Sequence, residues 1–211
     1  DTEQLSHHIS SRFNEDLERI RSSVMEMGGL VERQLGQALA GIVNADSSVL
    51  ALVAQAEINV NQLERSIDED CGRILATRSP AASDLRLLIA ILKTITDLER
   101  VGDESEKIAT IASRMAGRDW PSGRHRELRH LGSLVSAMVH DALDAFARLD
   151  AGLAFEVARR DRTVDEEYEA IHRQCITFMM EDPRSIRRAL DVMWAVRSLE
   201  RIGDHAKNIC E

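Results

Sequence analysis

Apolar residues recur at steps of three and four along most of the chain, which is the spacing of one face of an α-helix. This pattern predicts helices over residues 13–41, 46–77 and 79–116, followed by a break in the sequence GRDWPSG. Asp46 can accept hydrogen bonds at the start of the second helix, and Pro80 is tolerated in the first turn of the third. The stripe of the first predicted helix consists of Ile20, Val24, Met27, Val31, Leu35 and Leu39.

The second part of the chain repeats this plan. At an offset of 104 residues, Asp46 aligns with Asp150 and Cys71 with Cys175. The third predicted helix aligns with the last one at an offset of 101 residues, so the loop around 182–183 is three residues shorter than its counterpart. Such self-similarity indicates duplication of a three-helix unit. We therefore predict an all-α, six-helix fold of two tandem three-helix-bundle repeats, residues 1–117 and 118–211, with a last helix that is incomplete at residue 211.

The composition supports helices and restricts the partners. Of 211 residues, 44 % are hydrophobic and only 3 % aromatic, with three prolines and eleven glycines. A net charge of −9 disfavours general binding to nucleic acid or to anionic lipid. The sequence shows no apolar run long enough to span a membrane, no signal-peptide pattern and no CxxC pair among its three cysteines. We therefore expect a cytoplasmic protein with reduced thiols.

One six-residue phrase occurs twice, as LERVGD at 98–103 and as LERIGD at 199–204. In a helix the Glu and the Asp of each phrase lie side by side on one face, and the second helix of each unit carries a similar polar face. Clusters of carboxylate oxygens suit cations such as magnesium, manganese, iron or zinc. The candidate metal ligands are Glu57, Asn61, Glu99, Asp103, Asp161, Asp165, Glu200 and Asp204.

The spacing alone leaves a plainer interpretation open, in which these acids form a salt-bridged surface with Arg100 and Arg201. The repetition of the phrase argues for a shared constraint. Gly102 and Gly203 each cost about 1 kcal/mol in a helix relative to alanine. We therefore expect a neighbouring helix or a ligand to approach closely at both glycines.

Catalysis receives little support from the sequence. A carboxylate-bridged oxidase would use two Glu-x-x-His motifs, and the chain has only the one formed by Glu169 and His172. It contains no Walker loop, GxGxxG, GxSxG or HExxH motif. His205 follows Asp204 but points about 100° away around the helix, which makes it an outer-shell group at most. We expect the protein not to be an enzyme.

The pair LERVGDESEKIA and LERIGDHAKNICE, in two tandem three-helix units with acidic second helices, resembles the PhoU family, the accessory regulators of bacterial phosphate-specific transport. The resemblance implies a cytoplasmic, dimeric, negative regulator of the phosphate-starvation response. It also implies that the protein links the ATP-binding subunit of the phosphate transporter to the membrane-bound sensor histidine kinase.

Some members of that family bind multinuclear iron or zinc clusters at Glu/Asp-xxx-Asp motifs of helices two and three. Carried over to this chain, the motifs are Glu99 with Asp103, Glu200 with Asp204, and Asp161 with Asp165. Glu57 with Asn61 departs from the acidic pattern, so the resemblance implies that the first site binds a cation more weakly. A metal-free interaction module and a metalloenzyme remain as alternatives.

Overall fold

The structure, a computed structural model, describes residues 2–78, 80–116 and 125–211, although not the side chains of residues 2–12 and 125. These residues form six α-helices, one short 3₁₀-helix and no strand, which confirms the predicted all-α class. The predicted boundary between residues 117 and 118 lies outside the described residues. The elements are α1 (Thr2–Asn44), α2 (Val49–Arg78), α3 (Ala82–Met115), α4 (His125–Arg148), α5 (Ala151–Glu181), η1 (Pro183–Ser185) and α6 (Ile186–Cys210).

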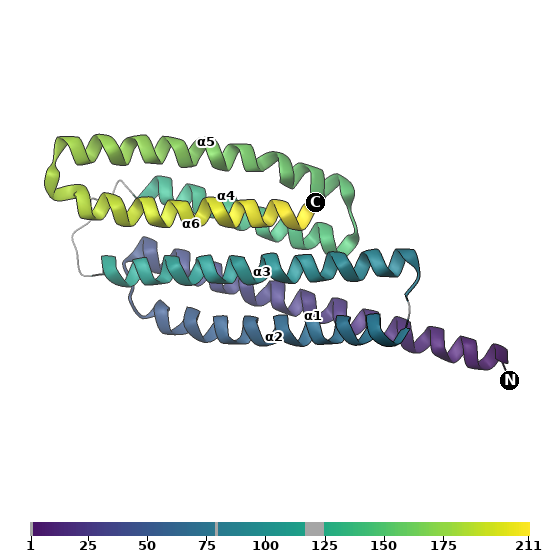
Figure 1. Cartoon of the computed structure of the whole chain (residues 1–211). Coiled ribbons are helices and arrows are strands. Elements are labelled where there is room, and N and C mark those ends of the chain that lie inside the picture. The colour runs from purple at the N-terminus through teal and green to yellow at the C-terminus, as the bar shows by residue number, and fades with distance from the viewer. Residues whose placement is uncertain (1, 79, 117–124) are drawn as a thin grey trace.

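The helices form two three-helix units that lie side by side (Figure 1). In the first unit α1, α2 and α3 contact one another, and in the second α4, α5 and α6 do the same. The units meet through α3 against α6 and through α1 against α4, so α2 and α5 lie on the outside (Figure 1). One continuous apolar core therefore runs through both units.

The predicted stripe of α1 is buried in this core, except that Leu39 lies at its edge. Ile20, Val24, Met27 and Val31 are fully buried, as the period of three and four requires. The helix itself is longer than the predicted 13–41, because it begins at Thr2 and ends at Asn44. Leu5 and Ile9, which precede Phe13 at steps of four, carry the same helical spacing into this extension.

Both units use the same turn between their first two helices. Ala45 and Leu149, which are equivalent at the offset of 104 residues, adopt left-handed backbones with φ of 52° and 54°. The amide of the following aspartate then donates to the carbonyl five residues earlier: Asp46 to Gly41 and Asp150 to Ala145, each at 2.9 Å. This pattern closes the last turn of a helix. The duplication is therefore preserved in backbone conformation as well as in sequence.

The interface between the units contains a reciprocal pair of close contacts. A Cβ atom on Gly28 would lie 2.6 Å from the nearest atom of Leu143, and one on Gly132 would lie 2.6 Å from Leu39. Gly28 is equivalent to Gly132, and Leu39 to Leu143, at the same offset. The two units thus pack with approximate two-fold symmetry, because each supplies a glycine that receives the leucine of the other.

Two smaller predictions differ from the structure. Pro80 is not in the first turn of α3, which begins at Ala82 after an extended Ala81 that makes no side-chain cap. The expected shorter second loop is not observed, because three residues, 79–81, separate α2 from α3, whereas four, 182–185, separate α5 from α6 and include η1. Among the described helices, none has a segment long and apolar enough to cross a membrane.

Candidate functional site

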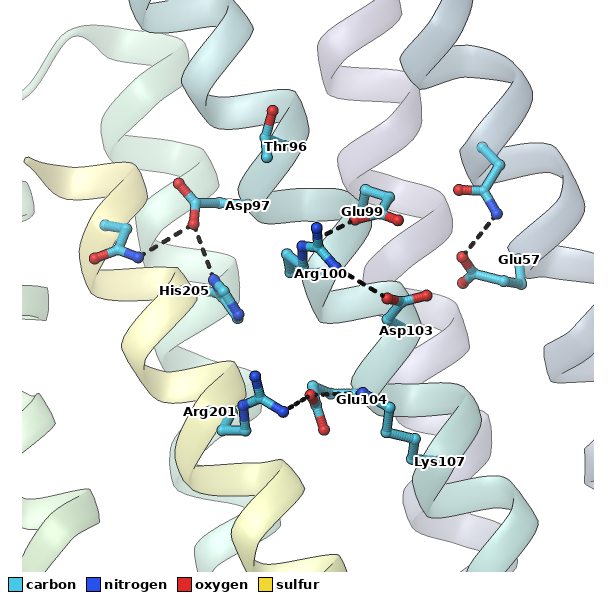
Figure 2. A network of polar contacts seen from close by, with 12 residues as sticks. Glu57, Thr96, Asp97, Glu99, Arg100, Asp103, Glu104, Lys107, Arg201 and His205 are labelled. Atoms are coloured by element: carbon cyan, nitrogen blue, oxygen red, sulfur yellow. Dashed lines mark hydrogen bonds and ion pairs between the residues drawn. The ribbon is translucent and has the colours of Figure 1, made fainter.

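The acidic residues of the first repeated phrase lie on the face of α3 that looks toward α2. Figure 2 shows Glu99 and Asp103 on one side of α3, facing Glu57, while Asp97 and Glu104 lie on the side facing α6. Gly102 explains the close approach: a Cβ atom there would lie 2.6 Å from Oε2 of Glu57. We expected a neighbouring helix or a ligand to approach this glycine closely, and the structure shows that the neighbouring helix α2 does so.

Glu57 is the most deeply buried acid of this group, with 6 % of its surface exposed. Gln34 of α1 donates from Nε2 to Oε2 of Glu57 at 2.7 Å, and Asn61 donates from Nδ2 to Oε1 at 3.0 Å. Burial raises the pKa of Glu57 above its ordinary value, the hydrogen bond from Gln34 opposes that shift, and the negative charge of Asp103 adds to it. The carboxylate is therefore held by amide groups rather than by a cation.

Glu99 also lies among other negatively charged side chains. Burial raises the pKa of Glu99, and the charges of Asp103 and Glu64 add to the shift while Arg100 opposes it. Arg100 lies 3.4 Å from Glu99 and 3.5 Å from Asp103, and its side chain is 55 % exposed. We call Glu57, Asn61, Glu64, Glu99, Asp103 and Glu106 the first cluster.

Sequence reasoning missed two residues of this region, Gln34 and Glu106. Gln34 is fully buried, and among the described residues its Oε1 has no hydrogen-bond partner. It falls between Val31 and Ala38 in the apolar stripe of α1, and an amide at such a position is the signal that could have identified it. Glu106 follows Asp103 by three residues on the same helix face, which is also a readable signal.

The second cluster consists of Asp161, Asp165, Glu200 and Asp204, from α5 and α6. The side chain of Asp161 is 9 % exposed and accepts a hydrogen bond from Nζ of Lys207 at 2.8 Å. Burial raises the pKa of Asp165, and the charges of Asp161 and Asp204 add to the shift. Gly203 packs closely against α5, since a Cβ atom on this glycine would be 3.3 Å from Val164.

Glu200 completes this cluster. Burial raises its pKa, Arg197 opposes the shift, and the charge of Asp204 adds to it. Arg197 is 3.7 Å from Glu200 and lies over the ring of Tyr168. Among the described residues, Oδ1 of Asp161 and Oε2 of Glu200 are buried oxygens without a hydrogen-bond partner.

The salt-bridged interpretation holds only in part. Arg100 does contact both acids of its own phrase. Among the described residues, however, Arg201 forms no ion pair with Glu200 or Asp204 and instead binds Glu104 across the interface at 2.8 Å. His205 also belongs to that interface, because its Nδ1 lies 2.9 Å from Oδ1 of Asp97 on α3 (Figure 2). These contacts join the two units on the opposite side of α3 from the first cluster.

The chemistry of both clusters fits a cation, although their geometry is not that of a closed metal centre. No group of three or more His, Cys, Asp or Glu side chains in the described ranges is arranged so as to hold a metal ion. The structure nevertheless places the acids of each half together, raises several of their pKa values and leaves buried carboxylate oxygens without partners. Each of these features is relieved by positive charge.

Comparisons with known proteins cover almost the entire chain. The PhoU domain family model matches residues 24–112 and 128–211. The chain is 54 % identical to the phosphate-specific transport system accessory protein PhoU homolog of Pseudomonas putida, over 99 % of this chain and 82 % of that protein. It is 47 % identical to the phosphate-specific transport system accessory protein PhoU of Escherichia coli (strain K12), over 100 % of this chain and 87 % of that protein.

Two solved structures have the same fold. The crystal structure of PhoU from Pseudomonas aeruginosa matches with a TM-score of 0.90 and 52 % identity, over 94 % of this chain and 95 % of that one. The structure of the phosphate transport system regulatory protein PhoU from Streptococcus pneumoniae matches with a TM-score of 0.87 and 30 % identity, over 94 % and 93 % of the two chains.

Proposed function

The chain belongs to the PhoU family, and on that premise we propose that it is a non-enzymatic cytoplasmic regulator of phosphate transport and a negative regulator of the phosphate-starvation response. The observation that carries the proposal is similarity along nearly the whole chain to phosphate-specific transport system accessory proteins. The doubled acidic phrase lies inside both matched segments, so the proposal covers the candidate site as well.

Its mode of action is that of an adaptor, which acts as a homodimer between the ATP-binding subunit of the phosphate transporter and the sensor histidine kinase. Support comes from the architecture: two related units with long exposed helical faces give one chain two similar but unequal surfaces. An adaptor needs separate surfaces for its partners and no pocket for chemistry. The two related units therefore suit this role.

We further propose that metal ions, iron or zinc first and manganese or magnesium as the alternatives, bind at the two clusters. In the first, the ligands are Glu57, Asn61, Glu99 and Asp103; in the second, they are Asp161, Asp165, Glu200 and Asp204. A bound cation neutralises the acids of each cluster and thereby ties α2 to α3 and α5 to α6. The unpartnered buried oxygens of Asp161 and Glu200 support this proposal.

A metal-free interaction module is the second candidate, and the contacts of Arg100 with Glu99 and Asp103 are the observation that favours it. A carboxylate-bridged metalloenzyme is less well supported. Glu169 of its one Glu-x-x-His motif has a side chain that is 64 % exposed, and His172 stacks near Tyr168 with ring centroids 4.4 Å apart.

A phosphate-starvation reporter tests the proposed regulation. A strain lacking this gene and grown with ample phosphate should show high alkaline phosphatase output, and the intact chain should restore low output. A variant with Glu99→Gln, Asp103→Asn, Glu200→Gln and Asp204→Asn should fail to restore it. Low output in the deletion strain itself would remove the proposed function.

The control variant makes the same change of net charge on exposed surface: Glu18→Gln, Glu69→Gln, Glu156→Gln and Glu166→Gln. It should restore low output as the intact chain does. Circular dichroism and thermal unfolding must show that both variants are folded. Equal repression by both variants would leave regulation in place but remove the doubled phrase from it.

A further inference from the structure

The two clusters differ in charge at one pair of equivalent positions. Because Glu99 aligns with Glu200 at the offset of 101 residues, Glu106 aligns with Lys207. Both residues lie seven positions after the glutamate of their phrase, on the same helix face. The first cluster therefore has a carboxylate where the second has an ammonium group.

In the second cluster the ammonium group of Lys207 is already bound to the most buried acid. Its Nζ donates to Oδ2 of Asp161 at 2.8 Å, and the contact raises the pKa of Lys207. Arg197 provides a second cation, 3.7 Å from Glu200. A metal ion that binds here must displace Lys207 from Asp161 or share the carboxylate with it, and like charges at that distance repel.

In the first cluster the corresponding charges are negative. Glu57 is equivalent to Asp161, but its carboxylate is bound by the neutral amides of Gln34 and Asn61. The charges of Asp103, Glu106 and Glu99 all act on Glu57. Arg100, with its side chain 55 % exposed, lies beside Glu99 and Asp103. More carboxylates and fewer cations around the same framework favour a bound cation.

A second observation comes from the buried amide. Gln34 is 0 % exposed, and among the described residues its Oε1 has no hydrogen-bond partner although its Nε2 is bound to Glu57. The oxygen is adjacent to Gly102, since a Cβ atom there would lie 3.2 Å from it. The equivalent residue of the second unit is Met138, which has no such oxygen. The first cluster thus contains a buried neutral oxygen that lacks a positive partner.

We propose that the two clusters are unequal cation sites: the first cluster binds a divalent cation tightly, whereas in the second cluster Lys207 serves as a built-in counter-ion that competes with one for Asp161. The proposal rests on the proposed metal binding and specifies it. Asn61 alone favoured a weaker first site, but its amide is engaged as a donor to Glu57, and the loss of one charge at position 61 is compensated by Glu106.

Titration of the metal-free full-length chain with Mn²⁺, followed by calorimetry and by the paramagnetic signal of free Mn²⁺, tests this order. The wild-type chain should show one tight class of site. Glu99→Gln with Asp103→Asn should abolish that class, and Glu200→Gln with Asp204→Asn should leave it. Reversal of the charge at each position should act in opposite directions: Glu106→Lys should weaken the tight class roughly tenfold or more, and Lys207→Glu should add a second tight class.

Charge changes at exposed positions outside both clusters are the controls. Glu156→Lys and Lys93→Glu should leave the tight class within about twofold of wild type, because solvent and salt screen distant charges. If Lys207→Glu unfolds the chain, Lys207→Gln replaces it and should also add a second class. Loss of the tight class in the second-cluster variant only, or two equal classes in wild type, would overturn the inequality. Absence of Mn²⁺ binding in every variant would overturn it together with the proposed metal binding, while the reporter assay would still decide the regulatory role.

Discussion

At the scale of single residues, the acids of the candidate site oppose the stability of the protein. Burial and neighbouring carboxylates raise the pKa values of Glu57, Glu99, Asp165 and Glu200, so the folded chain favours their neutral forms. A group with a raised pKa contributes stability below its ordinary pKa and loses that contribution as the pH rises through the raised value. At neutral pH these residues are thus unfavourable for folding, which is a common property of functional sites.

The variant Glu99→Gln should therefore make the metal-free chain more stable at pH 7. Removing the partly buried charge beside Asp103 and Glu64 should raise the free energy of unfolding by a few tenths to about 1 kcal/mol, because solvent screens a side chain that is 21 % exposed. The gain should shrink as the pH falls toward about 4, where Glu99 is protonated in the wild-type chain as well. Urea unfolding with a chelator across this pH range measures it.

Glu166→Gln is the matched control, because Glu166 has a side chain that is 65 % exposed and pairs with Arg162 on its own helix. Its effect on the free energy of unfolding should be close to zero and should not grow with pH. A loss of stability in Glu99→Gln at pH 7 as large as the expected gain would show that Arg100 balances the charge of Glu99 after all.

At this scale the sequence could predict which acids share a helix face, since that depends only on the period of the helix. It could not predict their partners on other helices. Lys207 binds Asp161 on α5, and Gln34 reaches Glu57 from α1, because helix packing brings together residues 46 and 23 positions apart in the chain. Identification of Lys207 as a counter-ion therefore required the structure.

At the scale of elements, the turns after α1 and α4 both contain a backbone conformation that is unfavourable for folding. Ala45 and Leu149 have left-handed backbones, which cost a residue with a Cβ atom about 1 kcal/mol relative to glycine. Neither turn contains glycine at this position, and both keep the same hydrogen bond from the following aspartate. The conformation is thus imposed by the closure of the helix rather than by the residue.

Leu149→Gly should raise the free energy of unfolding by roughly 0.5 to 1 kcal/mol, because Leu149 is 68 % exposed and little apolar contact is lost. The same replacement at Leu52, which is 56 % exposed within α2, should lower it by about 1 kcal/mol, because glycine is unfavourable in a helix interior. Thermal and urea unfolding of both variants measure the two effects. Destabilisation by Leu149→Gly would mean that its side chain holds the turn.

The sequence predicted the element types well because the helices are long and their apolar stripes are regular. It placed the end of α2 at residue 77 and that of α3 at 116, each one residue from the observed Arg78 and Met115. It failed at the start of α1, where Leu5 and Ile9 continue the spacing of four that leads to Phe13, a signal that the prediction left unused. It also failed at Pro80, which precedes the helix instead of lying in its first turn.

At the scale of the whole molecule, α3 separates two kinds of polar contact. Its acids toward α2 have a deficit of positive charge, whereas those toward α6 are paired: Glu104 with Arg201 and Asp97 with His205 (Figure 2). The second set joins the two units, and the first set forms the proposed cation site. Duplication could be read from the sequence, but the reciprocal packing of Gly28 and Gly132 that fixes the two units together could not.

The most direct test of the proposed adaptor role is binding of the purified full-length chain to the ATP-binding subunit of the phosphate transporter and to the cytoplasmic part of the sensor kinase. We expect a complex with each partner. The combined changes Glu99→Gln, Asp103→Asn, Glu200→Gln and Asp204→Asn should weaken it roughly tenfold or more, and the control variant at positions 18, 69, 156 and 166 should leave it unchanged. Absence of both complexes with folded wild-type protein, with and without Mn²⁺, would contradict the adaptor role.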